Sequence, residues 1–423
     1  MPDLPPHLLL RSSWQTVNIG DIAHTPGAIA LIQEAIPEAT ITLWPSHLDR
    51  GVETMLKDVF PRLNIVRGDT DDAGRPLTPE LQAAFTHCDI LIHGSGPSLV
   101  AGRHLLAWNN QTGKPYGLFG VTLDPFAWGA DGNWEGYQLD EAERRLTQGN
   151  APVLDSISQD ILKHASFAFF RDTLSLRYAQ AYLPQTVKRA FGPDATFACS
   201  LRDDSRADTW LACHGLEAGR YLVAIPRLRW TPYHEIHGTE ARPQDLAKQA
   251  VSQRTFRQDH AAVGELIQQW IQETGMPVII APEMTYQVQL AKTVWYDPMP
   301  ASLRSKIIWR DRYWLTDEAT SVYARAHTLV SLENHSPILA LAQSTPAIML
   351  RQPTDTFKGQ MWRDIGMEDW FMEIDEATPE RLWSTVAMIN ADRNAAIKRT
   401  KAIMSRVTSH HKVMTDTLMQ LLA

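Results

Sequence analysis

A glutamate and a histidine stand two residues apart in the segment TLVSLENHSPILALAQSTPAIMLR, between an apolar strand and a helix. Side chains two residues apart in extended chain share a face, so Glu333 and His335 are expected to point the same way. Ser336 can cap the helix and Pro337 can open it, and the free N–H groups of a helix N-terminus favour a bound anion. Histidine can act there as a general acid or base. The pattern therefore predicts either an anion-binding catalytic site or a capping histidine paired with Glu333.

Three cations follow other apolar strands. Arg171 ends the strand SFAFF and precedes Asp172, which is an expected helix N-cap. An arginine in this place is either an anion clamp or the structural partner of a carboxylate. Arg351 and Lys358 belong to a polar loop after the strand AIMLR, so both are expected at the edge of a cleft.

The turn near the N-terminus combines Asn18, Gly20 and Asp21 before a helix that Thr25 is expected to cap and Pro26 to open. Asparagine, glycine and aspartate are also ordinary turn residues, because they tolerate unusual backbone angles and hydrogen-bond their own backbone. The turn is therefore either a ligand contact or only a capped turn.

Two more loops carry candidate contacts. Gly94, Ser95 and Gly96 follow the buried strand CDILIH and form a tight loop where the backbone can approach an anion or a sugar. The loop is not a GxGxxG dinucleotide fingerprint. Asp194 lies in the loop GPDA, where its carboxylate either contacts a substrate hydroxyl or stabilises the turn.

The elements that must position these residues alternate between strand and helix along the whole chain, which is typical of an α/β protein with parallel sheets. We expect two Rossmann-like domains that face a cleft, over residues 1–205 (acceptor side) and 215–378 (donor side), and a long C-terminal helical segment over 379–423. Residues 200–219 are the expected linker. This outline is GT-B-like, and its ligands bind beyond the carboxyl ends of the strands. The expected strands are 7–11, 39–44, 63–67, 88–93, 115–121 and 166–170, and then YLVAIP, PVIIAP, KIIWRD, TLVSLE and AIMLR.

Composition limits the partners of the chain. Of its 423 residues, 44 % are hydrophobic and 21 % are charged, so each half can bury a core. A formal net charge of −8 provides no basic field for nucleic acid or for an anionic membrane surface. The apolar run near the N-terminus is too short for a signal peptide or a spanning helix, which predicts a cytoplasmic protein without an integral membrane segment. The 14 tryptophans suit either core packing or sugar binding.

No metal site is predicted. The three cysteines lack CxxC spacing, which indicates neither a disulfide framework nor a thiolate zinc site. The histidines at 24, 93, 104, 164, 234 and 237 are scattered, so we interpret them as structural or surface residues. The oligomeric state is left open by the sequence.

Five of these features, in this order, resemble the polysaccharide pyruvyl transferase family: the N-x-G-D turn at Asn18, the glycine loop at Gly94, F-R-D-x-x-S around Arg171, D-A-x-F from Asp194, and HSPILALAQSTPAI from His335. The resemblance covers roughly the first 375 residues and implies a GT-B-like fold. That family transfers the enolpyruvyl-derived group of phosphoenolpyruvate to two hydroxyls of a sugar, which leaves a cyclic ketal and phosphate. No metal or nucleotide cofactor is obligatory.

The resemblance implies that Arg171 binds the carboxylate or phosphate of phosphoenolpyruvate, and that His335 protonates its methylene carbon. Asn18, Gly20 and Asp21 would border the acceptor, a glycan or a lipid-linked oligosaccharide. The sequence departs from the family at Glu333, because the family usually has Arg-Leu-His where this chain has Glu-Asn-His. Either another cation, such as Lys358 or Arg351, compensates for the lost arginine, or the donor is no longer phosphoenolpyruvate.

Three functions remain open at this point. The first is a ketal pyruvyl transferase. The second is a hydrolase of a pyruvate ketal or another acidic sugar linkage, with Glu333 and His335 as an acid/base pair. The third is a non-catalytic glycan-binding member of the family. A nucleotide-sugar glycosyltransferase is a further candidate, because the helix N-terminus in SPILALAQSTP could hold a diphosphate.

Overall fold

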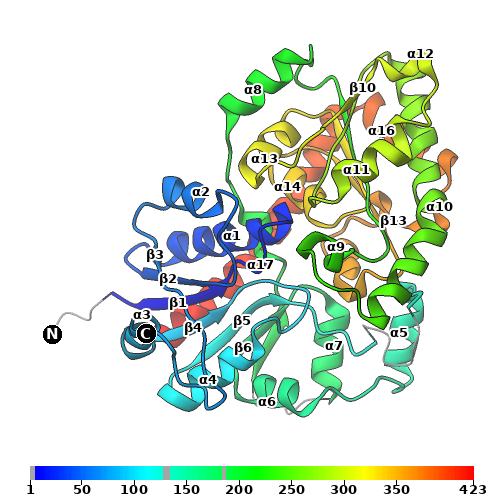
Figure 1. Ribbon diagram of the computed structural model, residues 1–423. Helices are drawn as coiled ribbons and strands as arrows, with labels where there is room; N and C mark the ends of the chain where they lie inside the picture. Colours follow the sequence, from blue (N-terminus) through cyan, green and yellow to red (C-terminus); the bar gives the residue numbers. More distant parts are fainter. Residues whose placement is uncertain (1–4, 127–133, 183–186) are drawn as a thin grey trace.

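The computed structural model describes residues 5–126, 134–182 and 187–423, and it contains two α/β halves that are each built on one parallel sheet (Figure 1). The strands are β1 His7–Ser12, β2 Thr40–Pro45, β3 Asn64–Ile65, β4 Ile90–His93, β5 Tyr116–Val121, β6 Phe167–Phe170, β7 Lys188–Phe191, β8 Leu222–Ile225, β9 Val278–Ile280, β10 Ile307–Trp309, β11 Thr328–Ser331, β12 Ala347–Arg351 and β13 Phe371–Glu373.

The α-helices connect these strands and cover the two sheets. They are α1 Ile19–Ala35, α2 Val52–Val59, α3 Pro79–His87, α4 Gly102–Thr112, α5 Leu139–Thr147, α6 Ser156–His164, α7 Thr173–Tyr182, α8 Asp204–Cys213, α9 Tyr233–His237, α10 Pro243–Thr274, α11 Gln287–Ala291, α12 Ala301–Arg304, α13 Thr316–Ala324, α14 His335–Ala342, α15 Gln360–Asp364, α16 Pro379–Ala391 and α17 Arg393–Leu422. A short 3₁₀ helix, η1, spans Ala195–Ala198.

The strand order places ligand sites at one edge of each sheet. The seven-stranded sheet runs β3-β2-β1-β4-β5-β6-β7, and the six-stranded sheet runs β10-β9-β8-β11-β12-β13. The order reverses between β1 and β4 and again between β8 and β11, and ligands of doubly wound sheets bind at such points, beyond the carboxyl ends of the strands. The candidate residues follow β1, β4, β6, β7, β11 and β12. The predicted GT-B-like fold class is confirmed.

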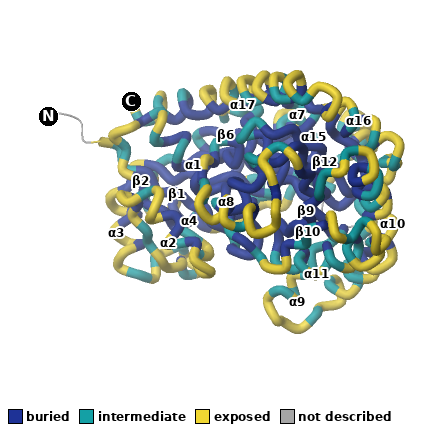
Figure 2. Tube along the Cα trace, turned by 90° about the horizontal axis from the view of Figure 1, so that it is seen from above, coloured by how far each residue is buried: buried dark blue, intermediate teal, exposed yellow. Residues whose placement is uncertain are grey.

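Apolar side chains on both faces of the strands explain why these sheets are parallel and buried. In β1, Leu8 and Leu10 belong to one hydrophobic cluster, whereas Leu9 belongs to a second cluster on the opposite face. Figure 2 shows the strands in the buried interior and exposed faces on outer helices such as α3. Each predicted strand is present within two residues of its expected bounds, whereas β7 and β13 were not predicted.

The start of α1 differs from the prediction. The helix begins at Ile19, because the Asn18 side chain caps it by accepting a hydrogen bond from Gly20 N at 2.7 Å. Thr25 does not cap the helix, since its hydroxyl donates to Ser12 Oγ at 2.9 Å, and Pro26 lies inside α1. The polar turn that the sequence showed is therefore the first turn of a buried helix.

Three other expectations about helices require correction. Helix α14 begins at His335 with Asn334 as its N-cap, so Ser336 lies in the first turn and does not cap it. The expected linker 200–219 contains helix α8. The segment after residue 378 forms two helices, α16 and α17, because the Asp392 side chain starts a new helix by accepting from Ala395 N at 2.9 Å. The expected cap Asp172 is confirmed, since Ser175 N donates to it at 2.7 Å.

Helix α17 returns from the C-terminal half to the N-terminal half and packs against α1 and η1 (Figure 1). His411 on this helix donates from Nε2 toward the carbonyl oxygens of Pro193 and Asp194, both at 3.2 Å. The helix thus supports the loop that carries the Asp194 carboxylate.

The contact between α1 and the 195 loop leaves no room for a larger residue at Gly27, where a Cβ atom would lie 2.0 Å from Ala195 O. We expect Gly27→Ala to lower the free energy of unfolding by about 1–3 kcal/mol, because overpacking forces the backbone apart. Glu34→Ala, an exposed change on the same helix, should stay within about 0.5 kcal/mol of the original protein. Urea unfolding of the two variants measures the difference, and equal stability would contradict this packing.

Candidate active site

A cavity of about 170 Å³ lies between the two halves, beyond the carboxyl ends of both sheets. Its wall combines Asn18, Asp21 and Arg171 of the N-terminal half with Glu333 and His335 of the other half. The remaining lining residues are Gln15, Pro97, Arg227, Arg229, Trp230, Thr231, Tyr233, Lys248, Met284, Thr354, Asp355, Thr356 and Lys358. The structure therefore brings six of the predicted site residues into one cavity.

His335 is held at the start of α14 by a glutamate from another strand end. Its Nδ1 lies 3.2 Å from Glu283 Oε1, in the loop after β9. The second oxygen of Glu283 accepts from the backbone N–H of Ser336 at 2.6 Å and from the Ser336 hydroxyl at 2.7 Å. Glu283 thus fixes both the imidazole and the first turn of α14, and Ser336 supports the site without lining the cavity.

This arrangement favours a protonated imidazole. Burial by itself lowers the pKa of His335, but the hydrogen bond and charge of Glu283, with help from Asp194, raise it above its ordinary value. Burial raises the pKa of Glu283, but His335 outweighs it and the net pKa is lowered. His335 and Glu283 therefore form a buried ion pair, and within the described part of the chain His335 Nε2 has no hydrogen-bond partner.

Asp194 is the centre of a second buried group. Arg171 Nη1 donates to Asp194 Oδ2 at 2.6 Å, and His24 Nδ1 lies 2.9 Å from Asp194 Oδ1. Burial raises the pKa of Asp194, but the His24 and Arg171 contacts outweigh it and bring it well below its ordinary value. Arg171 also donates from Nε to Thr122 Oγ1 at 2.8 Å, while its Nη2 has no hydrogen-bond partner among the described residues. Arg171 is thus a carboxylate partner that keeps one donor group available beside the cavity.

His24, Asp194 and His335 also have the spacing of a metal-binding group, since one ligand atom from each lies within 4.8 Å of the others. The Arg171 guanidinium is bonded to the same aspartate, and its positive charge opposes a cation there. The cluster is better suited to holding a proton network than a divalent ion.

Cations and carboxylates alternate on the opposite wall of the cavity. Arg227 forms an ion pair with Asp355 and lies 3.4 Å from Glu333 Oε1, and Lys358 Nζ lies 3.0 Å from Asp355 Oδ1. Burial lowers the pKa of Lys358 to about 7, and the charge of Arg227 adds to the effect. Lys358 therefore changes its charge near neutral pH, in direct contact with the cavity.

Glu333 lies in the same cavity but is not the partner of His335. Its Oε1 accepts from Gln287 Nε2 at 2.7 Å. Burial raises the pKa of Glu333, and the charge of Glu283 adds to this, although Arg227 opposes it. A raised pKa favours the neutral carboxyl, which would lessen its repulsion of an anion beside it.

Four predicted residues lie outside the cavity wall. Ser95 donates to Phe119 O at 2.7 Å and accepts from Ala195 N at 2.9 Å, so the loop of Gly94, Ser95 and Gly96 braces the 195 loop, and its neighbour Pro97 is the residue that reaches the cavity. Arg351 is fully buried and forms an ion pair with Glu373 at 2.9 Å.

Gly20 is required where α1 passes the catalytic histidine candidate, since a Cβ atom there would lie 2.1 Å from His335 Cγ. We expect Gly20→Ala to displace the imidazole and to lower any turnover that depends on His335 by about tenfold or more, because reacting groups must be held closely. The fold should persist, since alanine suits a helix. Initial rates and a thermal melt test this, and an unchanged rate would show that the close approach is not needed.

Comparison with known proteins comes after this geometry. The polysaccharide pyruvyl transferase family matches residues 18–352. The chain belongs to this family. No curated protein matches it significantly.

Solved structures share the fold of this pyruvyl transferase family member at low sequence identity. The Staphylococcus aureus MnaA–UDP structure covers 97 % of both chains, with a TM-score of 0.54 and 8 % identity. Anabaena HepE with UDP and glucose covers 98 % of this chain and 100 % of its own, with a TM-score of 0.55 and 10 % identity. UDP-GlcNAc 2-epimerase from Neisseria meningitidis has the same coverages, a TM-score of 0.55 and 11 % identity. No described helix has the length and apolarity that a membrane crossing requires.

Three residues of the site were missed in the family member's sequence. Glu283 and Arg227 follow β9 and β8, and the rule that ligands meet strand ends could have directed attention to both. His24 was interpreted as structural or surface, and it lies instead in the Asp194 cluster. Only the third dimension shows that His24, on α1, faces a loop that is 170 residues away in the chain.

Proposed function

We propose that this pyruvyl transferase family member transfers the enolpyruvyl-derived group of phosphoenolpyruvate to two hydroxyls of a glycan sugar and forms a pyruvate ketal. The acceptor is a free or lipid-linked oligosaccharide in the cytoplasm, and the reaction needs no metal or nucleotide. The observation that carries the proposal is His335, held as a protonated imidazole by Glu283 in a cavity lined by five lysine or arginine side chains.

The cationic wall suits a donor with a carboxylate and a phosphate. Arg227 and Lys358 face the cavity from the C-terminal half, and Arg171 offers its remaining Nη2 group from the other half. Guanidinium and ammonium groups bind such anions through charge-assisted hydrogen bonds. Arg351 is committed to Glu373, so Lys358 and Arg227 are the residues that compensate for the family arginine replaced by Glu333.

The proton balance of the reaction fits one acid. His335 gives its proton to the methylene carbon of phosphoenolpyruvate, and the first sugar hydroxyl adds to C2. The bond from C2 to the phosphate oxygen then breaks, and the second hydroxyl closes the ketal. One hydroxyl proton restores His335 and the other leaves with phosphate, so that no oxidant or reductant is needed.

A hydrolase is the second candidate, since Glu333 has a raised pKa and shares the cavity with His335. Two protonated groups beside a bound pyruvate ketal could supply general acid catalysis of its hydrolysis. The two functions differ in what they consume, because only the transferase uses phosphoenolpyruvate.

The test incubates the full chain with phosphoenolpyruvate and a panel of oligosaccharides, and it measures phosphate release and the new ketal methyl group by NMR. Glycan-dependent phosphate release with ketal formation supports the transferase. Pyruvate release from a pyruvylated glycan without phosphoenolpyruvate would support the hydrolase instead. Binding of glycan with neither reaction would leave only the non-catalytic alternative.

Lys358 makes donor binding depend on pH. Its pKa of about 7 is below the ordinary lysine value, so the ammonium charge is present at pH 6.5 and is lost as the pH rises toward 8.5. We expect calorimetric titration of phosphoenolpyruvate to show an affinity that falls about tenfold over this range, since a hydrogen bond to a charged group contributes about 1.5–3 kcal/mol.

The arginine variant provides the matched comparison, because arginine stays charged throughout this range. Lys358→Arg should flatten the pH dependence, and Lys358→Met should bind weakly at every pH. Lys398→Met changes an exposed lysine on α17 and should behave like the original protein. Equal binding of the Lys358→Met variant at pH 6.5 would remove Lys358 from the donor site.

A further inference from the structure

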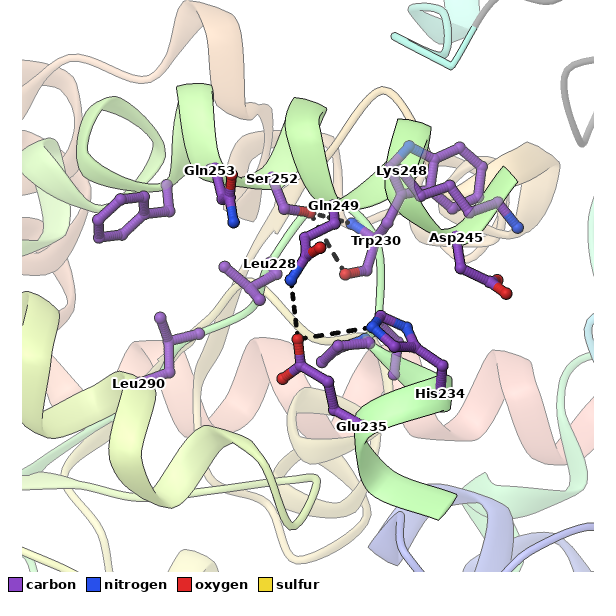
Figure 3. A pocket seen from close by; sticks show the side chains of 13 residues that line it. Leu228, Trp230, His234, Glu235, Asp245, Lys248, Gln249, Ser252, Gln253 and Leu290 are labelled. Atoms are coloured by element: carbon purple, nitrogen blue, oxygen red, sulfur yellow. Dashed lines mark hydrogen bonds and ion pairs between the residues drawn. The ribbon is translucent and has the colours of Figure 1, made fainter. Parts of the chain in front are cut away.

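A second pocket of about 260 Å³ adjoins the catalytic cavity and is formed largely by α9, α10 and the loop before α9 (Figure 3). Trp230, Thr231 and Lys248 line both pockets. The second pocket is thus directly continuous in its wall with the site where we place the reacting sugar hydroxyls. The other residues that line it are Leu228, Pro232, His234, Glu235, Asp245, Gln249, Ser252, Gln253, Phe256 and Leu290.

One side of this pocket is apolar and fixed in place. Leu228, Phe256 and Leu290 contribute hydrocarbon surface beside the indole of Trp230. The indole N–H donates to Trp134 O at 2.7 Å, and the Lys248 ammonium lies 4.7 Å from the centre of the Trp230 ring. The rigid wall offers a surface on which an apolar ligand face can pack at low entropic cost.

The other side presents hydrogen-bonding groups that suit hydroxyls. Gln249 Nε2 donates to Glu235 Oε1 at 2.9 Å, and Figure 3 shows these two side chains meeting across the pocket beside His234. A carboxylate and an amide can each accept a hydrogen bond from a hydroxyl, and the amide can also donate one. A pyranose matches this division, because its ring C–H groups form an apolar face and its hydroxyls surround the edge.

The charges of the two pockets differ in a way that separates donor from acceptor. The catalytic cavity has five lysine or arginine side chains against three carboxylates, whereas the second pocket contains Glu235, Asp245 and the single ammonium of Lys248. Glu235 would repel an acidic sugar in the second pocket. The volume is close to the lower end of small-molecule sites, roughly 300 Å³, and so suits one sugar ring.

We propose that this pocket binds a neutral pyranose, the sugar unit next to the one that receives the pyruvate ketal. The assignment of the neighbouring unit rests on the proposed function, and the acceptor is then at least a disaccharide. Helix α9 lies at the exposed edge of the molecule, so a longer glycan can continue into solvent beyond the pocket (Figure 2).

Sugar binding is tested without phosphoenolpyruvate, by saturation-transfer NMR of the full chain with methyl glycosides of glucose, galactose and mannose, and with methyl glucuronide. We expect saturation transfer to at least one neutral glycoside and at least tenfold weaker binding of the glucuronide. The double variant Glu235→Ala/Gln249→Ala should lose about tenfold or more in affinity, because it removes the hydroxyl partners. Glu240→Ala/Gln258→Ala, which changes two exposed residues outside the pocket on the same loop and helix, should bind as the original protein does.

A variant that fills the pocket guards against loss of fold in the double variant. Leu290→Trp should also abolish binding, and thermal melts show whether each variant is folded. No binding of any neutral glycoside, or binding that survives in both folded pocket variants, overturns the proposal.

The outcome is separable from that of the proposed reaction. Sugar binding in this pocket without ketal formation would retain the site and reject the transferase. Ketal formation with an acceptor KM that the folded pocket variants leave unchanged would retain the transferase and reject this site.

Discussion

His335→Ala is expected to reduce glycan-dependent phosphate release from phosphoenolpyruvate by about 10²- to 10⁴-fold, the usual contribution of a positioned general acid. The imidazole is the group whose Nε2 has no hydrogen-bond partner in the described part of the chain, at the wall of a cavity that both halves form. Removing it leaves the methylene carbon of the donor without a proton source. The loss should appear in kcat, while the affinity for phosphoenolpyruvate changes much less, because the anion contacts remain.

The comparison needs a folded variant and a neutral control. His335→Gln retains a hydrogen-bonding side chain near Glu283 and should be as inactive as His335→Ala if the proton is what matters. His214→Ala changes an exposed histidine outside the cavity and should turn over normally. A rate for folded His335→Ala within tenfold of the original protein would reject His335 as the acid.

The fold could be predicted because burial on both faces gives parallel strands a continuous apolar sequence. The segments CDILIH and TLVSLE show this directly, and β4 and β11 lie within them. Strand β7, Lys188–Phe191, was missed because it is an edge strand with two cations among its four residues. Helix starts were less predictable, since both Asn18 and Thr25 have the chemistry of a cap and the surrounding structure decides between them.

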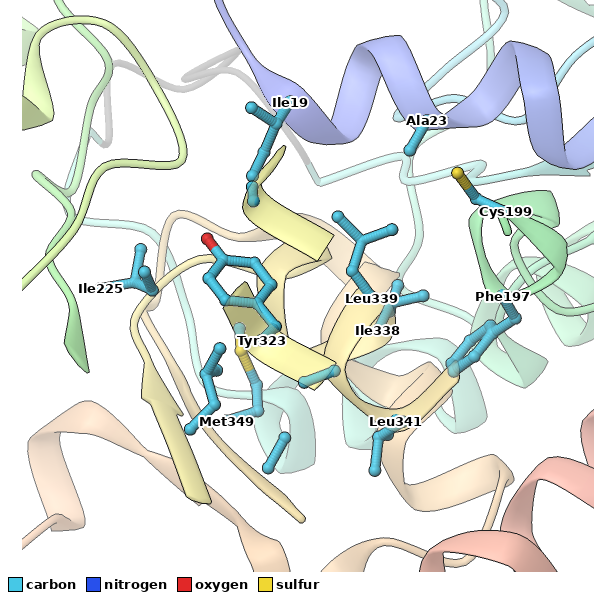
Figure 4. Packing of buried hydrophobic residues seen from close by; sticks show 14 of the residues in the cluster. Ile19, Ala23, Phe197, Cys199, Ile225, Tyr323, Ile338, Leu339, Leu341 and Met349 are labelled. Atoms are coloured by element: carbon cyan, nitrogen blue, oxygen red, sulfur yellow. The ribbon is translucent and has the colours of Figure 1, made fainter. Parts of the chain in front are cut away.

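The candidate site could be predicted only where its residues follow strands in motif order. His335, Arg171 and Asn18 are of this kind. What the sequence could not show is which halves of the chain pack together: Figure 4 shows Ile19 and Ala23 of α1 facing Ile338 and Leu339 of α14. That apolar contact brings the histidine at the start of α14 against the first turn of α1.

The identity of the histidine's partner also depends on this packing. Glu333 is the carboxylate nearest in sequence, yet Glu283, 52 residues away, is the one that holds the imidazole. Glu333 is instead bonded to Gln287 and faces Arg227. Proximity in extended chain gives a shared face, but the turn into α14 separates the two side chains.

Glu283→Gln is expected to move the pH dependence of turnover to lower pH. The acid must be protonated, so the rate falls as the pH rises through the pKa of His335. Glu283 raises that pKa against the effect of burial, and a neutral glutamine leaves burial without its main opponent. The falling limb of the pH–rate profile should therefore shift downward by about one pH unit or more, which at pH 7.5 is a rate loss of about tenfold.

The shape of the profile separates this positioning role from a structural one. Glutamine has nearly the volume of glutamate and can still accept from Ser336 N, so the rate of Glu283→Gln should recover toward the original value near pH 6. Damage to the fold would instead lower the rate at every pH. Glu318→Gln, a buried glutamate paired with Arg310 at 2.8 Å away from the cavity, provides the control and should leave the limb in place. An unshifted limb in Glu283→Gln would mean that His335 does not supply the proton, because no other group of the cavity wall is hydrogen-bonded to Glu283 among the described residues.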